Sequence, residues 1–282
     1  MLQLKHQETE ASMSTISAQT REDFNRDGVC VLRNIVPAEW RNRLETAIEE
    51  NMLTPGPYGK NHTEEGKPGA YFGDYVNWQR IAAYKDVCDQ GPLGAIAGEL
   101  MDASRTQLFH EHVLVKEPGT ADPTPWHQDL PYYCLDGSKT VSIWVPLDPV
   151  SKAVCPHFIA GSHKGSITYV PRRFKTLEPL EGDTSVYHPF PEIDETEQAA
   201  DLRAWDLAPG DAVAFDYHTL HNAPPNTSGT RRRAVSFRFI GEDCRYVARS
   251  HAVSPPFDEM GLNLNMGDVL PENWFPVVWQ RP

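Results

Sequence analysis

The feature of this sequence that most constrains its fold is a change of pattern near residue 106. From there to about residue 245, the chain runs in short stretches of alternating apolar and polar residues, which Gly and Pro interrupt. We predict strands over 108–115, 140–147, 211–217 and 234–240. Short strands separated by turns are typical of all-β domains. The pattern therefore predicts a mainly β fold, a double-stranded β-helix (a jelly roll, or cupin-like) barrel.

The N-terminal part of the chain has helical periodicity instead. The run Thr-Arg-Glu-Asp at 20–23 resembles a capping box and predicts a helix that ends near Gly28. A strand is expected over 29–35, and a longer helix from Pro37 to about residue 53. Another helix fits residues 93–100. We expect these α-helices to buttress one sheet of the barrel.

The composition is that of one globular domain. With 282 residues, 40% of them hydrophobic, the chain can bury a sizeable core. Residues 1–19 are polar and rich in Ser, Thr and Gln, so we predict a disordered tail there. The remaining residues, 20–282, are predicted to form a single domain whose β-helix core spans about 106–245.

Charge and cysteine usage limit the partners. A net charge of −13 argues against a nucleic acid or an anionic membrane surface as the main partner. There is no apolar run of 18 residues or more, and the start of the chain lacks the apolar stretch of a signal peptide. The five cysteines are scattered without C-x-x-C spacing. We expect a reduced, cytoplasmic protein that acts on a small molecule; the sequence does not predict its oligomeric state.

A metal-binding pattern lies between the first two strands predicted above, 108–115 and 140–147. His127 and Asp129 are two residues apart on an extended segment, so their side chains point to the same face. Together with one more imidazole they would form the facial triad of non-haem Fe(II) oxygenases. His218 and His221, which end a predicted strand, are both candidates for the third ligand. An arginine-rich segment and another strand follow, and a guanidinium beside a metal site binds carboxylates well.

The order of these and other motifs resembles the phytanoyl-CoA dioxygenase family of Fe(II)- and 2-oxoglutarate-dependent oxygenases, from about Arg21 to the C-terminus. The motifs are Trp126-His127-Gln128-Asp129, Trp144-Val145-Pro146-Leu147-Asp148, Gly161-Ser162-His163-Lys164-Gly165, Pro209-Gly210-Asp211 and Leu220-His221-Asn222-Ala223-Pro224. In that family an arginine eleven positions after the distal histidine holds the distal carboxylate of 2-oxoglutarate. The residue at that distance from His221 is Arg232, whereas from His218 it is Gly229. The resemblance therefore selects His221 as ligand and Arg232 as the co-substrate anchor.

The resemblance also implies the chemistry. Fe(II) bound by His127, Asp129 and His221 would keep positions open for 2-oxoglutarate and O2. The reaction expected by default is hydroxylation of a substrate C–H bond, with release of succinate and CO2. Related halogenases have a small residue in place of the carboxylate, so Asp129 disfavours halogenation.

Several neighbouring residues are further candidates. By the same resemblance Trp144 lines the co-substrate pocket, although packing in the core is the alternative. Thr124 and Thr140 are candidates for hydrogen bonds to 2-oxoglutarate, and capping of strand ends is the alternative for both. Tyr132 and Tyr133 are candidates for substrate contact or for shielding the site. Lys116 we interpret as a charge at a strand end.

Two irregular stretches, 54–73 and 164–203, are candidates for lids over the barrel mouth. The sequence departs from the family at 152–158, which lacks the usual Asn-Gly turn and leaves the nearby pocket wall open to question. The overall acidity and an acidic run at 192–197 favour a smaller or neutral-to-cationic substrate over a CoA thioester. The alternatives to an oxygenase are a zinc-dependent hydrolase on the same ligands and a non-catalytic jelly-roll binding module.

Overall fold

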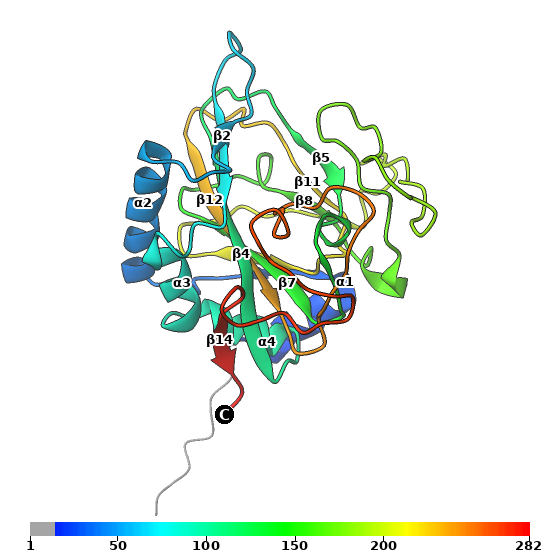
Figure 1. The fold of residues 1–282 in the computed structure, drawn as a ribbon. Coiled ribbons are helices and arrows are strands. Elements are labelled where there is room, and N and C mark those ends of the chain that lie inside the picture. The colour runs from blue at the N-terminus through cyan, green and yellow to red at the C-terminus, as the bar shows by residue number, and fades with distance from the viewer. Residues whose placement is uncertain (1–14) are drawn as a thin grey trace, which may run out of the picture.

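The structure, a computed structural model, describes residues 15–282 and is built around two β-sheets that pack against each other (Figure 1). The major sheet has the strand order β1-β10-β7-β12-β4-β3-β2, with β14 paired to β4, and the minor sheet has the order β5-β11-β8-β9. The paired strands of both sheets are antiparallel. The predicted mainly β jelly roll is confirmed, but the described strands form separate sheets and not one closed barrel.

The bounds of the elements are as follows. The major sheet contains β1 (Val29–Leu32), β2 (Lys60–Asn61), β3 (Tyr71–Tyr75), β4 (Arg105–Lys116), β7 (Thr140–Pro146), β10 (Ala212–Phe215), β12 (Arg232–Ile240) and β14 (Val277–Gln280). The minor sheet contains β5 (Thr124–His127), β8 (His157–Ile159), β9 (Leu202–Arg203) and β11 (His221–Ala223), and β6 (Leu135–Asp136) pairs with β13 (Arg245–Tyr246). The helices are α1 (Ala18–Asp27), α2 (Ala38–Leu53), α3 (Ala82–Asp89) and α4 (Leu93–Leu100).

Alternation along the central strands separates the hydrophobic core from the site. On β7, Val141, Ile143 and Val145 belong to the cluster that packs against the helices, whereas Trp144 belongs to the cluster between the sheets. On β12, Val235 likewise faces the helices. Because successive side chains of a strand point to opposite faces, the alternate residues of both strands face the minor sheet. That inward face is where polar side chains can meet a ligand.

The helices cover the outer face of the major sheet, with α2 and α3 side by side (Figure 1). Helix α1 begins at Ala18, two residues before the predicted start, because the Ser17 hydroxyl accepts a hydrogen bond from the Thr20 N–H at 3.0 Å and so acts as N-cap. Gly28 ends it in the left-handed region, at φ 72°. Residues 18 and 19, which were predicted to belong to a disordered tail, are therefore helical, and residues 1–14 of that prediction lie outside the described part of the chain.

Helices α2 and α4 were predicted, and the five predicted strands overlap β1, β4, β7, β10 and β12, whereas α3, β2, β3, β14 and the strands outside the major sheet were not predicted. Strand β3 lies inside a stretch that was expected to be irregular, and β14 adds a second partner to β4 close to the C-terminus. The major sheet therefore includes strands that come before and after the predicted core (106–245) in the sequence. No helix among residues 15–282 is both long and apolar enough to span a membrane.

Buried hydrogen bonds fix the first irregular stretch to the sheet. Asp74 on β3 is fully buried and accepts hydrogen bonds from Asn51 Nδ2 at 2.6 Å and from the Gly56 N–H at 2.7 Å. Asn51 also accepts a hydrogen bond from the Tyr84 hydroxyl at 3.2 Å. Buried polar groups that are paired in this way hold one geometry, because breaking them leaves a desolvated charge. Buried hydrogen bonds therefore hold the end of α2, the stretch that follows it and β3 together.

Candidate active site

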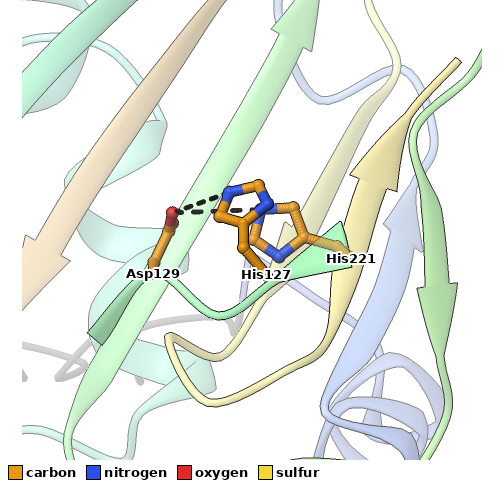
Figure 2. Close-up of side chains that lie close together, drawn as sticks. All are labelled: His127, Asp129 and His221. Carbon is orange, nitrogen blue, oxygen red and sulfur yellow. Dashed lines mark ion pairs between the residues drawn. The ribbon is translucent and has the colours of Figure 1, made fainter. Parts of the chain in front are cut away.

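Two strands of the minor sheet bring the predicted histidines together. Strand β5 ends at His127 and β11 begins at His221, and the two residues are directly opposite each other in the antiparallel pair. Their ring centroids are 4.1 Å apart. Figure 2 shows both rings side by side, with the Asp129 carboxylate facing them. A pairing that the sequence could not specify thus joins residues more than ninety positions apart.

Backbone carbonyls fix the orientation of both imidazoles. His127 Nδ1 lies 2.8 Å from the Pro125 carbonyl oxygen, and His221 Nδ1 lies 2.9 Å from the Thr219 carbonyl oxygen. In this arrangement Nδ1 carries the proton and donates it, so the lone pair is on Nε2. Burial lowers the pKa of His127 to about 3 and lowers that of His221 as well. Both rings are therefore neutral, which is the form that binds metal.

Asp129 presents one oxygen to the two rings and uses the other for support. Its Oδ1 lies 3.8 Å from His127 Nε2 and 3.9 Å from His221 Nε2. Its Oδ2 accepts a hydrogen bond from Ser142 Oγ at 2.9 Å and lies 3.7 Å from Arg238 Nε. Burial alone would raise the pKa of Asp129, but the Arg238 guanidinium, together with the hydrogen bond from Ser142, outweighs burial and lowers that pKa. The carboxylate is charged and has one oxygen free for a metal.

The three side chains fit a divalent metal ion. One donor atom from each lies within 4.8 Å of the other two, and all three residues are buried. Two neutral imidazoles and one carboxylate on the same side of an ion leave its other positions open, as in non-haem Fe(II) sites. His218, the other candidate ligand, is turned elsewhere, with Nδ1 at 3.2 Å from Asp216 Oδ1. In the described residues the geometry therefore selects His221.

A cavity of about 460 Å³ opens in front of the three residues. Its walls include four of the other predicted residues, namely Thr124, Tyr132, Tyr133 and Trp144. Thr140 does not line this cavity, so the structure gives no support to its predicted contact with 2-oxoglutarate. The reason is its position on β7. Thr140 is on the same face of the strand as Ser142 and Trp144, but it is two residues further from Trp144 than Ser142, the residue that contacts Asp129, and it pairs with Ile240.

Arg232 lies next to Tyr71, which lines the cavity, but Arg232 itself is not among the residues of the cavity wall. It is buried, its guanidinium donates to the Val154 carbonyl, and burial lowers its pKa. The Tyr71 hydroxyl, which lines the cavity, forms a hydrogen bond with Thr124. Arg232 makes no ion pair with a carboxylate within residues 15–282.

Lys116 is the direct neighbour of Arg232, because the two are paired across β4 and β12. Lys116 is the last residue of β4, so its predicted place at a strand end is correct, but the side chain is buried: it is 1% exposed, and its Nζ lies 4.6 Å from the Tyr71 ring centroid. Nζ donates to the Asp122 carbonyl at 2.7 Å, and burial together with Arg232 lowers its pKa to about 7. Two basic side chains therefore lie together in a buried position next to Tyr71.

Sequence reasoning missed Arg238 and Ser142, which support Asp129. Arg238 also donates to the Tyr133 hydroxyl at 2.9 Å, so Tyr133 is linked to the metal-binding carboxylate. The signal was present in β12, because Arg238 lies six positions after Arg232 and so faces the same way. Ser236, between them on that face, also lines the cavity. Alternation along β12 would therefore have identified Ser236 and Arg238 as residues on the same face as Arg232, and alternation along β7 would have placed Ser142 on the face of Trp144.

Both irregular stretches that were predicted as lids contribute to the cavity walls, the first through Tyr58 and Lys60 and the second through residues 172–174. The Phe174 ring lies 4.8 Å from the His127 ring although it is 45% exposed. The Tyr132 hydroxyl donates to the Arg172 carbonyl and accepts from the Arg172 N–H, both at 2.8 Å. A tyrosine three residues beyond a predicted ligand therefore fastens the second stretch over the site.

A jelly roll that carries two histidines and an aspartate in this arrangement is the scaffold typical of non-haem iron oxygenases. The family model for phytanoyl-CoA dioxygenase (PhyH) matches residues 24–234, about three quarters of the chain. The chain belongs to the phytanoyl-CoA dioxygenase family, and its activity is that of a 2-oxoglutarate-dependent dioxygenase.

Individual relatives agree with this assignment. A probable phytanoyl-CoA dioxygenase of Caenorhabditis elegans is 23% identical over 83% of this chain and 78% of its own length. The peroxisomal phytanoyl-CoA dioxygenase of Homo sapiens is 22% identical over 83% of this chain and 71% of its own length. Both alignments extend across most of the chain, so the likeness is not confined to the metal-binding motif.

Solved structures show the same fold. The non-haem α-ketoglutarate-dependent carbocyclase SnoK from nogalamycin biosynthesis superposes with a TM-score of 0.72 over 94% of this chain and 97% of its own, at 22% identity. EctD from S. alaskensis, solved with 2-oxoglutarate and 5-hydroxyectoine, superposes with a TM-score of 0.65 over 96% of this chain and 86% of its own, at 18% identity. At these sequence identities the comparison establishes the fold, and the substrate has to be inferred from the residues of the site.

The geometry predicts that His221, and not His218, is needed for metal binding. His221→Ala removes one of three donors, so it should lower Fe(II) affinity by several orders of magnitude in an anaerobic titration. His218→Ala is the matched control, because this ring hydrogen-bonds Asp216 and not the other donors, and it should bind Fe(II) nearly as the wild type does. The reverse result, with His218→Ala unable to bind Fe(II), would show that the third ligand is misassigned.

Proposed function

We propose that the protein hydroxylates a C–H bond of a small organic molecule, with His127, Asp129 and His221 as ligands of Fe(II) and Arg232 as the anchor of 2-oxoglutarate. The observation that carries this proposal is the combination of a facial donor set with the buried side chains of Arg232 and Lys116 next to Tyr71, a residue of the cavity wall. When bound, the iron supplies activation of O2 and oxidation of the substrate C–H bond, while 2-oxoglutarate is converted to succinate and CO2.

The protein's own contribution begins with orientation of the ligands. The Pro125 and Thr219 carbonyls hold each imidazole with Nε2 toward the metal position. Ser142 and Arg238 occupy Asp129 Oδ2, so that Asp129 binds through Oδ1 alone and leaves more positions open. Partners that orient a metal ligand in this way typically change metal affinity by about 10–100-fold when they are removed.

The co-substrate proposal rests on charge. A buried guanidinium without a carboxylate is costly, and Arg232 has no such partner in the described part of the chain. Lys116 adds a second positive charge beside it. A dicarboxylate such as 2-oxoglutarate would supply the missing anion to Arg232 and Lys116, with the Thr124 and Tyr71 hydroxyls as further hydrogen-bond partners.

The aromatic residues have a different task. Trp144 and Tyr132 line the cavity and are largely buried, so they exclude water from the co-substrate and the metal. Tyr133 contributes its ring to the wall, but its hydroxyl is already engaged by Arg238. We therefore propose substrate contact through the rings of Tyr132 and Tyr133, with the hydroxyls serving to hold neighbouring segments.

The other two functional classes receive no support from the site. A zinc-dependent hydrolase needs a general base, yet Asp129 is the only carboxylate that lines the cavity within residues 15–282. Such an enzyme would also leave Arg232 and Lys116 without a role. A non-catalytic module has no need of three oriented metal donors around a cavity.

A cytoplasmic location is a further proposal. The five cysteines are all unpaired and buried, which agrees with a reducing compartment. The human relative is named peroxisomal, so fractionation of the source cells is the measurement that decides between the two compartments. A nucleic-acid partner is not proposed, because the net charge of −13 opposes it.

The chelate itself tests the reaction class. Adding Fe(II) and then 2-oxoglutarate to the protein without oxygen should produce the weak visible charge-transfer band of an iron–2-oxoglutarate chelate. The band should be absent when zinc replaces iron or when succinate replaces 2-oxoglutarate. Protein that keeps zinc through purification and gives no band with Fe(II) and 2-oxoglutarate would contradict the proposal.

Removal of the carboxylate should stop turnover without unfolding the protein. Asp129→Ala deletes one ligand and the partner of Ser142 and Arg238, so succinate formation should fall to the background of the metal-free protein. The circular dichroism spectrum should stay that of the wild type. Asp201→Ala removes an exposed carboxylate and should leave succinate formation unchanged; equal loss in both variants would argue against a specific role of Asp129.

Arg232→Ala should raise the concentration of 2-oxoglutarate required for half-maximal succinate formation by about 30-fold or more. The physical reason is that loss of one member of a buried charge pair costs about 2–5 kcal/mol. Arg231→Ala is the matched control, because Arg231 pairs at the surface with Glu49 and Glu117. If Arg231→Ala or Arg233→Ala raised the requirement and Arg232→Ala did not, the assignment of the anchor would be wrong.

A further inference from the structure

The charges around the cavity are opposite in sign to those of the whole chain. The protein has a net charge of −13, yet the cavity is lined by Lys60, Arg172, Arg173 and Arg238 and by a single carboxylate, that of Asp129. Arg238 is the cation that pairs with Asp129. Three positive side chains therefore remain on the walls without a negative group of the cavity to balance them.

Arg172 is the cation best placed to bind an anion. One of its N–H groups donates to the Trp126 carbonyl at 3.2 Å, and its guanidinium lies 3.6 Å from the centre of the Phe190 ring. A guanidinium has five N–H donors, and no carboxylate lies within ion-pair distance of Arg172 in the described chain. The side chain is half-buried and lies against Phe190, so its guanidinium is held on the cavity wall with donors that the Trp126 carbonyl does not use.

The position of Arg172 places this charge near the metal. The Trp126 carbonyl that it contacts belongs to the residue before His127. Two residues further on, Phe174 packs against the His127 ring. An anionic group held by Arg172 would thus lie on the wall beside the metal ligands and away from Arg232, which interacts with Tyr71 at the co-substrate end.

Two more cations stand on the same cavity. Lys60 on β2 lines it from the first irregular stretch and makes no ion pair within residues 15–282. Arg173 pairs with Glu181, but that carboxylate is 92% exposed, so the pair is a weak surface interaction. The positive charges thus come from both irregular stretches, which are themselves joined by the Lys175 and Glu64 pair at 3.7 Å.

The rest of the lining suits a ring-shaped substrate body. The Tyr58 and Tyr75 rings are stacked, with centroids 4.9 Å apart, and Tyr75 lies edge-on to His112 at 5.5 Å. Burial keeps the pKa of His110 at about 3 and that of His112 well below its usual value, so both histidines are neutral. His110 Nε2 and Ser236 Oγ are buried on the wall without a hydrogen-bond partner in the described residues. Aromatic walls with a few free polar atoms are typical of sites that orient a small molecule.

We propose that the substrate is a small molecule with an apolar, ring-shaped body and a carboxylate or phosphoryl group, and that Arg172 binds this anionic group. This inference rests on the proposed function, because it names the substrate class of the same site. It replaces the neutral-to-cationic substrate expected from the net charge, since the lining and not the whole chain meets the substrate. Arg172 is thereby a specificity-determining residue.

The test compares three probes of similar shape that differ in charge: 1-naphthoate, 1-naphthamide and 1-naphthyl phosphate. Their affinities are measured by calorimetry without oxygen, on protein saturated with 2-oxoglutarate so that the co-substrate end is filled, both with Fe(II) and metal-free. The variants are Arg172→Gln and Arg232→Gln. Lys175→Gln is the matched control, because it removes a positive charge from the same stretch at a side chain that is 69% exposed and does not line the cavity.

In the wild type and in Lys175→Gln, an anionic probe should bind about tenfold or more tightly than the amide, as expected for a charge-assisted hydrogen bond. In Arg172→Gln the affinities for the amide and for the two anionic probes should agree within about twofold. The anionic probe that the wild type binds more tightly shows whether the site is built for a carboxylate or a phosphoryl group. The Arg172 backbone keeps its bonds to Tyr132, so this variant should fold.

Three results would overturn the inference. They are equal affinity for amide and anions, failure of both anions to bind, and a preference for anions that survives Arg172→Gln but is lost in Arg232→Gln. Formation of the charge-transfer band in the same samples reports the proposed function separately. If the band forms but the protein does not distinguish the probes, only the proposed substrate class is rejected. If the metal-free protein prefers the anionic probes but no band forms with Fe(II), the oxygenase is rejected and the anion site is retained.

Discussion

The site depends on the register between β5 and β11. Because His127 and His221 are opposite each other in an antiparallel pair, two rings from distant parts of the chain share one space. Each ring is then held by the carbonyl two residues before it, at 2.8 Å and 2.9 Å. A shift of one residue would turn one of the rings to the other face of the sheet. Metal binding is therefore a property of strand pairing, and the side chains of Asp129, Ser142 and Arg238 refine what the backbone has already arranged.

Strand β12 connects that site to the hydrophobic core. Its residues alternate between Val235, Phe237 and Phe239, which pack against the helices, and Arg232, Ser236 and Arg238, which face the other way. The same nine residues thus stabilise the fold and place both the proposed co-substrate anchor and the support of Asp129. Since β12 pairs with β4 on one side and β7 on the other, its inward side chains lie on a strand whose backbone is hydrogen-bonded at both edges.

The sequence was informative where the signal is local. Alternation predicted β4, β7, β10 and β12, and the spacing of His127 and Asp129 predicted two ligands. The third ligand was open between His218 and His221 until a resemblance to a known family separated them, because no local rule states which histidine a distant strand will face. Lys116 shows the same limit: its burial results from pairing with Arg232 and from the Tyr71 ring, both of which are tertiary contacts. The position of Thr140 along β7, outside the cavity wall, is likewise not visible in the sequence.

The way in which Tyr132 holds the second irregular stretch has a consequence for how such a site changes over time. Its hydroxyl contacts only the backbone N–H and carbonyl of Arg172, so it fastens the loop without regard to the side chain at that position. Residue 172 can therefore be exchanged while the loop keeps its course and the iron ligands keep their support. Selection of a new substrate and retention of the oxidative chemistry are separable in this scaffold, and a single position gives evolution or a protein engineer a place to alter the first without disturbing the second.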